Sequence, residues 1–212
     1  MKHTKKMLAV SAVAVSLFSL SACSSTLENA QLGTPVKIGS SDGHRPVWAE
    51  NLKEYQKEHS DRVYFVGLSG NVADYSLARE EAYADALQNL ANGIKDTVHN
   101  LYTAAKTQDG NQTDYNYDVE KAVEDGTLQT AKGIITGASV DKYFWNKYVK
   151  KNGDGRIDEY LSVYALVSLS KEDYRKTVEL TLTDEQKVTK DVRARGVIKE
   201  MKKLYLKNGE TK

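Results

Sequence analysis

The sequence predicts an α+β fold: a small antiparallel sheet of about three strands (one strand, then a long hairpin), packed by a long alanine-striped helix, with a C-terminal amphipathic helix. Three observations lead to this prediction. A β-rich run at 62–68 comes before a long run with helical periodicity. Two segments, the second of which alternates between apolar and other residues, then flank a tight turn, which is typical of a hairpin. The chain closes on a segment whose apolar residues recur at helical spacing among lysines and arginines.

The first strand is predicted at Arg62–Leu68, because RVYFVGL is rich in β-branched and aromatic residues and is followed by SGN. A glycine inside a strand, here Gly67, indicates a bulge or a close backbone neighbour. Before this strand, Trp48 is expected to be buried. The segment 49–55 is expected to form a short helix introduced by Pro46.

The long helix is predicted to start after Asp74, a good N-cap residue, and to extend to about Ala105. Three alanines at four-residue intervals leave no bulk on its apolar face, so we expect this helix to lie close against the sheet. This packing role is favoured over a ligand groove. The apolar face contains Leu77, Ala78, Ala82, Ala86, Leu87, Leu90, Ala91 and Ile94.

A weaker helix is predicted near 119–128, made irregular by Gly126. A hairpin follows, with strands at 133–149 and 156–169 joined by the turn sequence KKNGDGR. In the second strand every odd-numbered residue from Leu161 to Leu169 is apolar. This set is therefore expected to face a core.

Two capping boxes, Ser170 with Asp173 and Thr183 with Gln186, predict helix starts near the C-terminus. The segment after Thr183 is expected to form an amphipathic helix that ends near 208–209. A solvated face is the favoured interpretation of its polar side; docking on peptidoglycan, lipid headgroups or a partner is the alternative. The basic residues of that side are Lys199, Lys202, Lys203 and Lys207.

The N-terminus resembles a secretory signal. A short basic segment is followed by an uncharged apolar run at 7–20, which is too short for a stable membrane-spanning helix of about 20 residues. The run ends in Leu20-Ser21-Ala22-Cys23, which matches the lipobox of bacterial lipoproteins. That resemblance implies cleavage between Ala22 and Cys23, transfer of diacylglycerol to the Cys23 thiol, and acylation of the new amine. Ser24, in place of an aspartate, favours the outer membrane.

Composition narrows the function classes. Removal of 1–22 takes three of the 30 basic residues, so 27 remain against 29 acidic residues and nothing in the overall charge attracts nucleic acid. Cys23 is the only cysteine, so its lipidation leaves no thiol for a disulfide, for catalysis or for a metal. Thirteen tyrosines against three phenylalanines indicate half-solvated sheet faces and interfaces.

No catalytic, cofactor-binding or metal-binding residue is predicted. Read as an EF-hand, NGDGRIDE would place Lys150 and Leu161 where the calcium loop needs carboxylates, so a hairpin turn is favoured. His59 and His99 have no partner at the spacing of metal ligands. GLSGN lacks the G-x-S-x-G spacing, and the chain has no phosphate-binding G-x-x-x-x-G-K-[ST].

Four segments together resemble the LPP-twenty lipoprotein family, a set of small bacterial outer-membrane lipoproteins, some of them tied to flagellar basal structures. They are RPVW, VYFVGLSGNVADYSLAREEAYADALQNLA, SVDKYFWNKYV and YLSVYALVSLSKEDY, which cover about 45–174. The resemblance implies a compact α+β fold with a helix on a small antiparallel sheet. It implies no catalytic residue.

The predicted organisation is a cleaved signal at 1–22, lipidated Cys23 with a flexible tether to 44, an LPP-like domain at 45–174, and a helical extension at 175–212. The favoured function is a lipid-anchored outer-membrane protein with a non-catalytic structural or scaffolding role, in one version flagellar. Its partners would be outer-membrane lipid and either a second copy or an envelope protein, because sheet edges can recruit neighbours. The alternative is a periplasmic binding module for peptidoglycan, glycolipid or another envelope protein. A hydrolase is the least favoured hypothesis.

Overall fold

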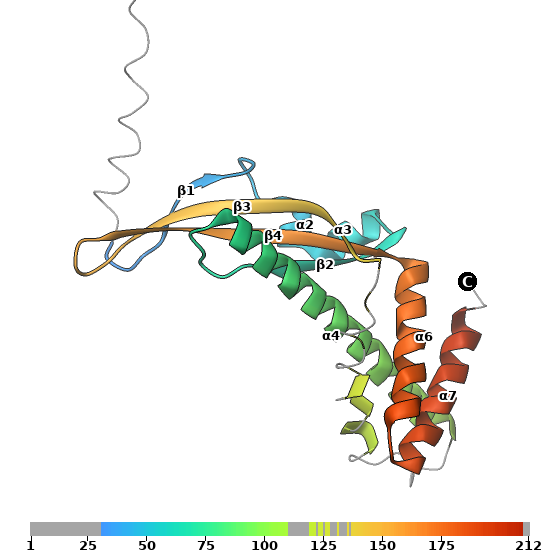
Figure 1. The fold of residues 1–212 in the computed structure, drawn as a ribbon. Coiled ribbons are helices and arrows are strands. Elements are labelled where there is room, and N and C mark those ends of the chain that lie inside the picture. The colour runs from blue at the N-terminus through green and yellow to red at the C-terminus, as the bar shows by residue number, and fades with distance from the viewer. Residues whose placement is uncertain are drawn as a thin grey trace, which may run out of the picture.

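The computed structural model describes residues 31–109 and 137–209, with positions 119–121, 123, 124, 126, 127, 131 and 135 between them. One antiparallel sheet has four strands in the order β1-β3-β4-β2 (Figure 1). The predicted α+β fold is confirmed, with one strand more than expected. The elements are β1 (Val36–Ser40), α2 (Val47–Glu50), α3 (Leu52–Glu58), β2 (Arg62–Leu68), α4 (Tyr75–Asp109), β3 (Ser139–Lys151), β4 (Ile157–Ser170), α6 (Lys171–Val188) and α7 (Val192–Gly209).

The additional strand, β1, lies inside the segment predicted to be a flexible tether. That prediction is wrong for Val36–Ser40, which pairs with β3 so that Val36 faces Val149 and Ser40 faces Asn146. A short strand interrupted by a bulge carries little alternation of its own. It is ordered by the edge of β3, which a local pattern does not reveal. The tether residues 23–30 lie outside the part of the chain that the structure describes.

The hairpin is confirmed, and its first strand begins at Ser139 rather than near 133. β3 pairs with β4 from Ser139 opposite Ser168 to Lys151 opposite Ile157. The turn is closed by the Asn152 amide on the Arg156 carbonyl at 2.8 Å, and Gly155 has a φ of +83°. This positive φ explains the glycine, because other residues rarely adopt it.

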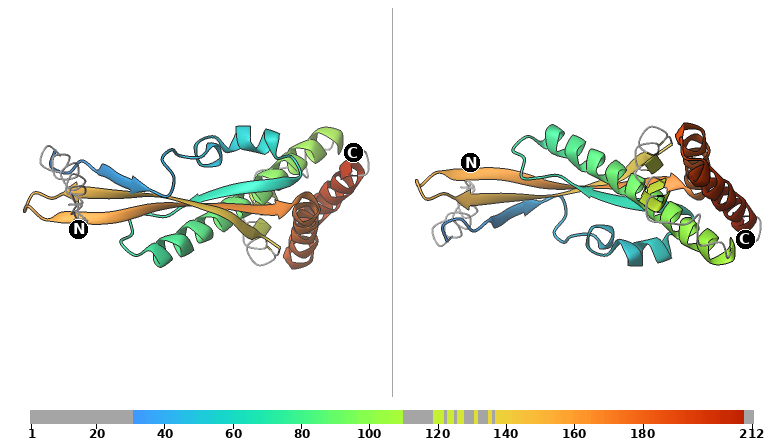
Figure 2. Two further views of the ribbon diagram at one scale, coloured as in Figure 1. Left: turned by 90° about the horizontal axis from the view of Figure 1, so that it is seen from above. Right: turned by 90° about the horizontal axis from the view of Figure 1, so that it is seen from below.

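The two faces of the sheet are covered by different helices (Figure 2). On one face, Ala78 and Ala82 of α4 pack against Val163 and Ala165 of β4, as the odd-numbered pattern predicts. The opposite face is covered by α2 and α3. There Trp48 and Tyr55 pack with the strand residues Tyr64, Phe144 and Leu166.

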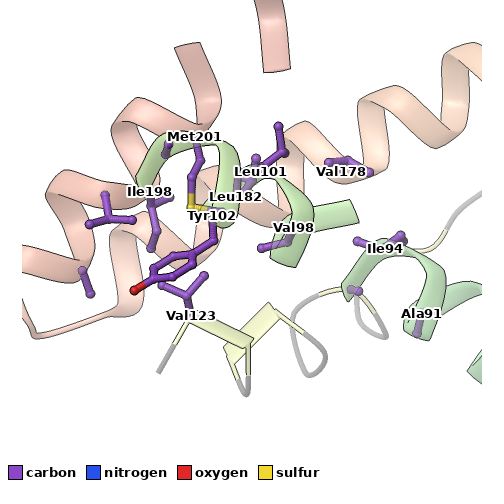
Figure 3. Close-up of a cluster of buried hydrophobic side chains, with 14 of the residues drawn as sticks. Ala91, Ile94, Val98, Leu101, Tyr102, Val123, Val178, Leu182, Ile198 and Met201 are labelled. Atoms are coloured by element: carbon purple, nitrogen blue, oxygen red, sulfur yellow. The ribbon is translucent and has the colours of Figure 1, made fainter. Parts of the chain in front are cut away.

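The second half of α4 leaves the sheet and forms a helical core with α6 and α7 (Figures 1 and 3). The 35 residues of α4 span about 50 Å at the usual rise of about 1.5 Å per residue, which is longer than the sheet it crosses. The helix ends at Asp109, close to the end predicted near Ala105. The helical core includes Ile94, Val98, Leu101, Val178, Leu182, Ile198 and Met201.

At the C-terminus one predicted helix start is confirmed and one is wrong. The Ser170 hydroxyl accepts the Asp173 amide hydrogen bond at 2.9 Å and caps α6. Thr183 lies inside α6, where its hydroxyl donates to the Glu179 carbonyl at 2.7 Å. Asp191 instead caps α7. The predicted boundary between 174 and 175 also falls inside α6, which continues across it.

The outer edge of β2 is closed by side chains from α3 and α4. Gln56 spans two backbone groups: its side-chain NH₂ donates to the Arg62 carbonyl at 2.6 Å, and its oxygen accepts the Tyr64 amide at 2.9 Å. Asn89 donates to the Val66 carbonyl at 2.9 Å, and Asp85 accepts the Leu68 amide at 2.9 Å. These four bonds occupy backbone groups on the open side of β2, which makes this edge a poorer template for another strand.

Candidate functional site

The predicted lipidation site, Cys23, and the cleavage site between Ala22 and Cys23 lie outside the described residues, as does Ser24. The described chain begins beside the hairpin turn, where the Gly33 amide donates to the Lys151 carbonyl at 2.9 Å. Nine residues, and so ten Cα–Cα steps, separate Cys23 from Gly33. They can reach at most about 35 Å when fully extended. The fold thus brings the chain out near the hairpin turn, at the end of the sheet opposite the helical core (Figure 1).

A groove of about 550 Å³ lies between α2–α3 and β3 and is a candidate site on the sheet. Local sequence features position the helices that form its floor. Pro46 precedes α2 and directs Trp48 inward. The Asn51 side chain accepts the Glu54 amide and caps α3. Trp48 and Phe144 are buried beneath it. The groove therefore rests on a rigid aromatic base.

Aromatic stacking shapes one wall of this groove. The rings of Tyr55 and His59 are stacked with centroids 4.0 Å apart, and Tyr64 meets Tyr55 edge-on at 5.2 Å. His59 Nδ1 lies 3.0 Å from the Tyr55 carbonyl oxygen. Because a carbonyl only accepts, Nδ1 carries the hydrogen, and Nε2 of a neutral ring is the nitrogen that can accept from a ligand.

The rim of the groove carries both signs of charge. Asp42, Glu58 and Lys142 line it, and the Lys142 ammonium lies 5.7 Å from the centre of the Tyr55 ring. An aromatic base with a mixed polar rim suits a polar chain that also presents an apolar or ring surface, such as a peptide or a glycan. The sequence missed this groove, since its residues come from segments about 100 positions apart. Trp48 was the one local signal.

Ser69, from GLSGN, has a structural role. It is buried, and its hydroxyl oxygen accepts the Val163 amide at 2.9 Å. Its own amide donates to the Val163 carbonyl at 2.9 Å. Both bonds extend the pairing beyond the end of β2, so the oxygen is engaged with the backbone.

The basic residues of the last helix lie on its outer side, as predicted. Lys199, Lys203 and Lys207 of α7 are exposed, while Ile198 and Met201 of the same helix are buried in the helical core. The Lys203 ammonium pairs with Glu200 at 2.7 Å.

His99 is surrounded differently from what its sequence context indicates. The structure places Glu120 and Glu124 beside it, with Nδ1 at 3.6 Å and 2.5 Å from their carboxylate oxygens. Lys95 contacts the second oxygen of Glu124 at 3.3 Å. Partial burial acts to raise the pKa of Glu124, but hydrogen bonds from His99 and Lys95 and their charges outweigh it and hold that pKa below its ordinary value. The spacing of Glu120 and Glu124, one helical turn, was the only sequence signal for this cluster.

Comparison of the chain with protein-family models, with curated proteins and with solved structures finds no match. Across residues 31–109, 137–209 and the described positions between them, the helices are all too short or too polar to cross a membrane.

Proposed function

We propose that this protein is an outer-membrane lipoprotein of the LPP-twenty family, anchored through acylated Cys23, with a non-catalytic structural or scaffolding role in the cell envelope. Support for the anchor comes from the lipobox Leu20-Ser21-Ala22-Cys23. Attachment to a flagellar basal structure is one version of this role, which the family resemblance favours.

The observation that carries the scaffolding role is the position of the chain's entry into the fold. Gly33 is bonded to Lys151 at the hairpin turn, and β4 leads directly from that turn into α6. The 14 residues of β4 span about 46 Å at about 3.3 Å per residue. With Cys23 in the membrane, the hairpin turn would face the bilayer and the helical core would be held away from it.

The alternative, a periplasmic binding module, is favoured by the groove between α2–α3 and β3. Its buried aromatic floor is preorganised, and its rim offers carboxylates and an ammonium. In this version the groove, rather than the hairpin turn or the basic helix, would contact peptidoglycan, glycolipid or another envelope protein.

The anchor is tested by expressing the native chain, Cys23→Ser and Ser24→Asp, with metabolic palmitate labelling and membrane fractionation. We expect label and outer-membrane location for the native chain, neither for Cys23→Ser, and label with inner-membrane retention for Ser24→Asp. An unlabelled native chain that is released into the medium would overturn the proposal.

The partner surface is tested by crosslinking in cells followed by mass spectrometry. The charge-reversed variants Glu58→Lys and Lys142→Glu change the groove rim, and Lys199→Glu is a matched control on the exposed side of α7. We expect crosslinks to an envelope component to weaken in the rim variants only. Equal crosslinking in all of them would exclude the groove, and loss in Lys199→Glu alone would assign the contact to α7. Retention on purified sacculi at low salt separates peptidoglycan from a protein partner.

A further inference from the structure

We propose that His99, Glu120 and Glu124 form a binding site for a divalent transition-metal ion of the Zn²⁺ type. The site would join the middle of α4 to the helical residues near 120. It lies on the helical side of the molecule, apart from the groove, and is independent of the proposed function.

The three donor atoms already have nearly the spacing that such an ion requires. One oxygen of each carboxylate and Nδ1 of His99 all lie within 4.8 Å of one another. Ligand bonds of about 2.0–2.1 Å in a tetrahedron place neighbouring donors about 3.3 Å apart. The Nδ1 distances of 2.5 Å and 3.6 Å bracket that value, and the two carboxylate oxygens lie within 4.8 Å of each other, so side-chain torsions would rotate as the ion binds.

The three ligand residues come from two separate helical segments, which orient the side chains toward one another. Glu120 and Glu124 are one turn apart on the same face of their helical segment, while His99 faces them from α4. A set of one imidazole and two carboxylates suits zinc and similar ions. Calcium and magnesium prefer all-oxygen sites with more ligands, so this cluster discriminates against them.

The surroundings leave room for the ion and orient one ligand. The Lys95 ammonium holds the second oxygen of Glu124 at 3.3 Å, which leaves the first oxygen directed at His99. The side chains of His99, Glu120 and Glu124 are 45%, 31% and 26% exposed, so solvent can supply a fourth ligand. The positive charge of Lys95 opposes a cation, and we therefore expect an affinity in the micromolar range rather than a tighter one.

In the metal-free state a hydrogen bond joins His99 to Glu124, and Lys95 forms an ion pair with Glu124. Nδ1 of His99 carries a hydrogen that it donates to the Glu124 carboxylate, because an ionised carboxylate only accepts. Zinc would bind the Nδ1 lone pair of the tautomer that carries its hydrogen on Nε2, so the ion would replace the hydrogen bond between His99 and Glu124.

The test is calorimetric titration of zinc chloride into the full chain purified as cells produce it, without an affinity tag. We expect one ion per chain, a loss of about tenfold or more in affinity for His99→Ala and for Glu124→Gln, and little response to calcium or magnesium. His44→Ala, at an exposed position outside the groove, and Glu200→Gln are matched controls that should bind as the native chain does.

Thermal unfolding followed by circular dichroism provides a second readout and shows that each variant is folded. Zinc should raise the melting temperature of the native chain and of His44→Ala but not of His99→Ala. Binding only at millimolar zinc, or equal binding by folded His99→Ala, would overturn the site and leave the cluster as it is in the metal-free state. Neither result bears on acylation of Cys23.

Discussion

Gly67 of β2 lies directly against Ala86 of α4, with no room for a side chain between them. A Cβ at Gly67 would overlap the Ala86 amide nitrogen and the Ala82 carbonyl oxygen, both of which belong to the helix backbone. The glycine in the strand and the alanines on the helix are therefore two halves of one contact. This contact sets how closely α4 approaches the sheet.

We predict that Gly67→Ala destabilises the fold by about 3 kcal/mol, because backbone atoms must move to admit the methyl group. Urea denaturation measures the change. Gly39→Ala in β1 is the matched control, since its Cβ would meet its nearest neighbours at 3.8 Å and 3.9 Å. We expect the control to stay within about 0.5 kcal/mol of the native chain. Equal losses in the two variants would contradict the account of the contact.

The second prediction concerns the closed edge of β2. Gln56→Ala frees the Arg62 carbonyl and the Tyr64 amide, at an expected cost of about 1 kcal/mol. The opened edge should also promote association, measured as a rise of apparent mass with concentration.

Gln88→Ala removes a bond to the side chain of Asn92 on the surface of α4 and serves as the control for that variant. We expect it to change neither stability nor mass. A Gln56→Ala chain that behaves like this control would show that the edge bonds have no protective effect.

The proposal of self-association through a sheet edge applies to β1, whose outer side is the other edge of the sheet.

The third prediction concerns the start of α7. The Asp191 carboxylate accepts the amides of Arg193 at 2.8 Å and Ala194 at 3.3 Å, and these backbone hydrogen bonds are the main cause that lowers the pKa of Asp191 below its ordinary 3.8. Its stabilising effect is present above that ordinary value and is lost as the pH falls through the lowered pKa. Asp191→Ala should lower the melting temperature at neutral pH. It should also reduce the drop in melting temperature between neutral pH and pH 3.

Asp191→Asn is the matched variant, because its side-chain oxygen can still accept both amides. We expect it to retain more of the neutral-pH stability than Asp191→Ala, with the acid dependence equally reduced. Thermal melts at neutral pH and near pH 3 compare the three chains. An unchanged acid dependence in both variants would show that Asp191 does not contribute to it.

The fourth prediction concerns alkaline pH. Burial raises the pKa of Tyr102 and of Tyr205 to about 12 in each case, from an ordinary 10.0. Above pH 10 the unfolded chain loses these protons first. The contribution of these two tyrosines to the free energy of unfolding is therefore fully present below pH 10 and is lost as the pH rises toward 12. Denaturation midpoints at increasing pH, with phenolate absorbance recorded in parallel, measure the loss.

A Tyr102→Phe, Tyr205→Phe double variant should lose less stability over that interval. Tyr75→Phe, at a 40% exposed position, is the control and should lose as much as the native chain. Parallel losses in all three chains would assign the alkaline transition to other groups.

Much of the fold was predictable from patterns that span a few residues. Asp74 caps α4 at the Leu77 amide, Ser170 caps α6, and the Asn152–Arg156 turn closes the hairpin. These features depend on neighbours in the chain, so their residue types are sufficient signals. The close approach at Gly67 was also predictable, although its partner helix was not.

The sequence alone thus determined the fold class, the principal strands and helices, and the hypothesis of a lipid anchor at Cys23. Tertiary structure decided the pairing of β1 with β3, the groove beneath α2–α3, and the meeting of His99 with Glu120 and Glu124. It also selected Asp191 over Thr183 as the cap of the last helix. The physical reason is the same for β1, the groove and the His99 cluster: these contacts depend on how whole elements pack against one another, and that packing leaves no periodic trace in the residues that make the contact.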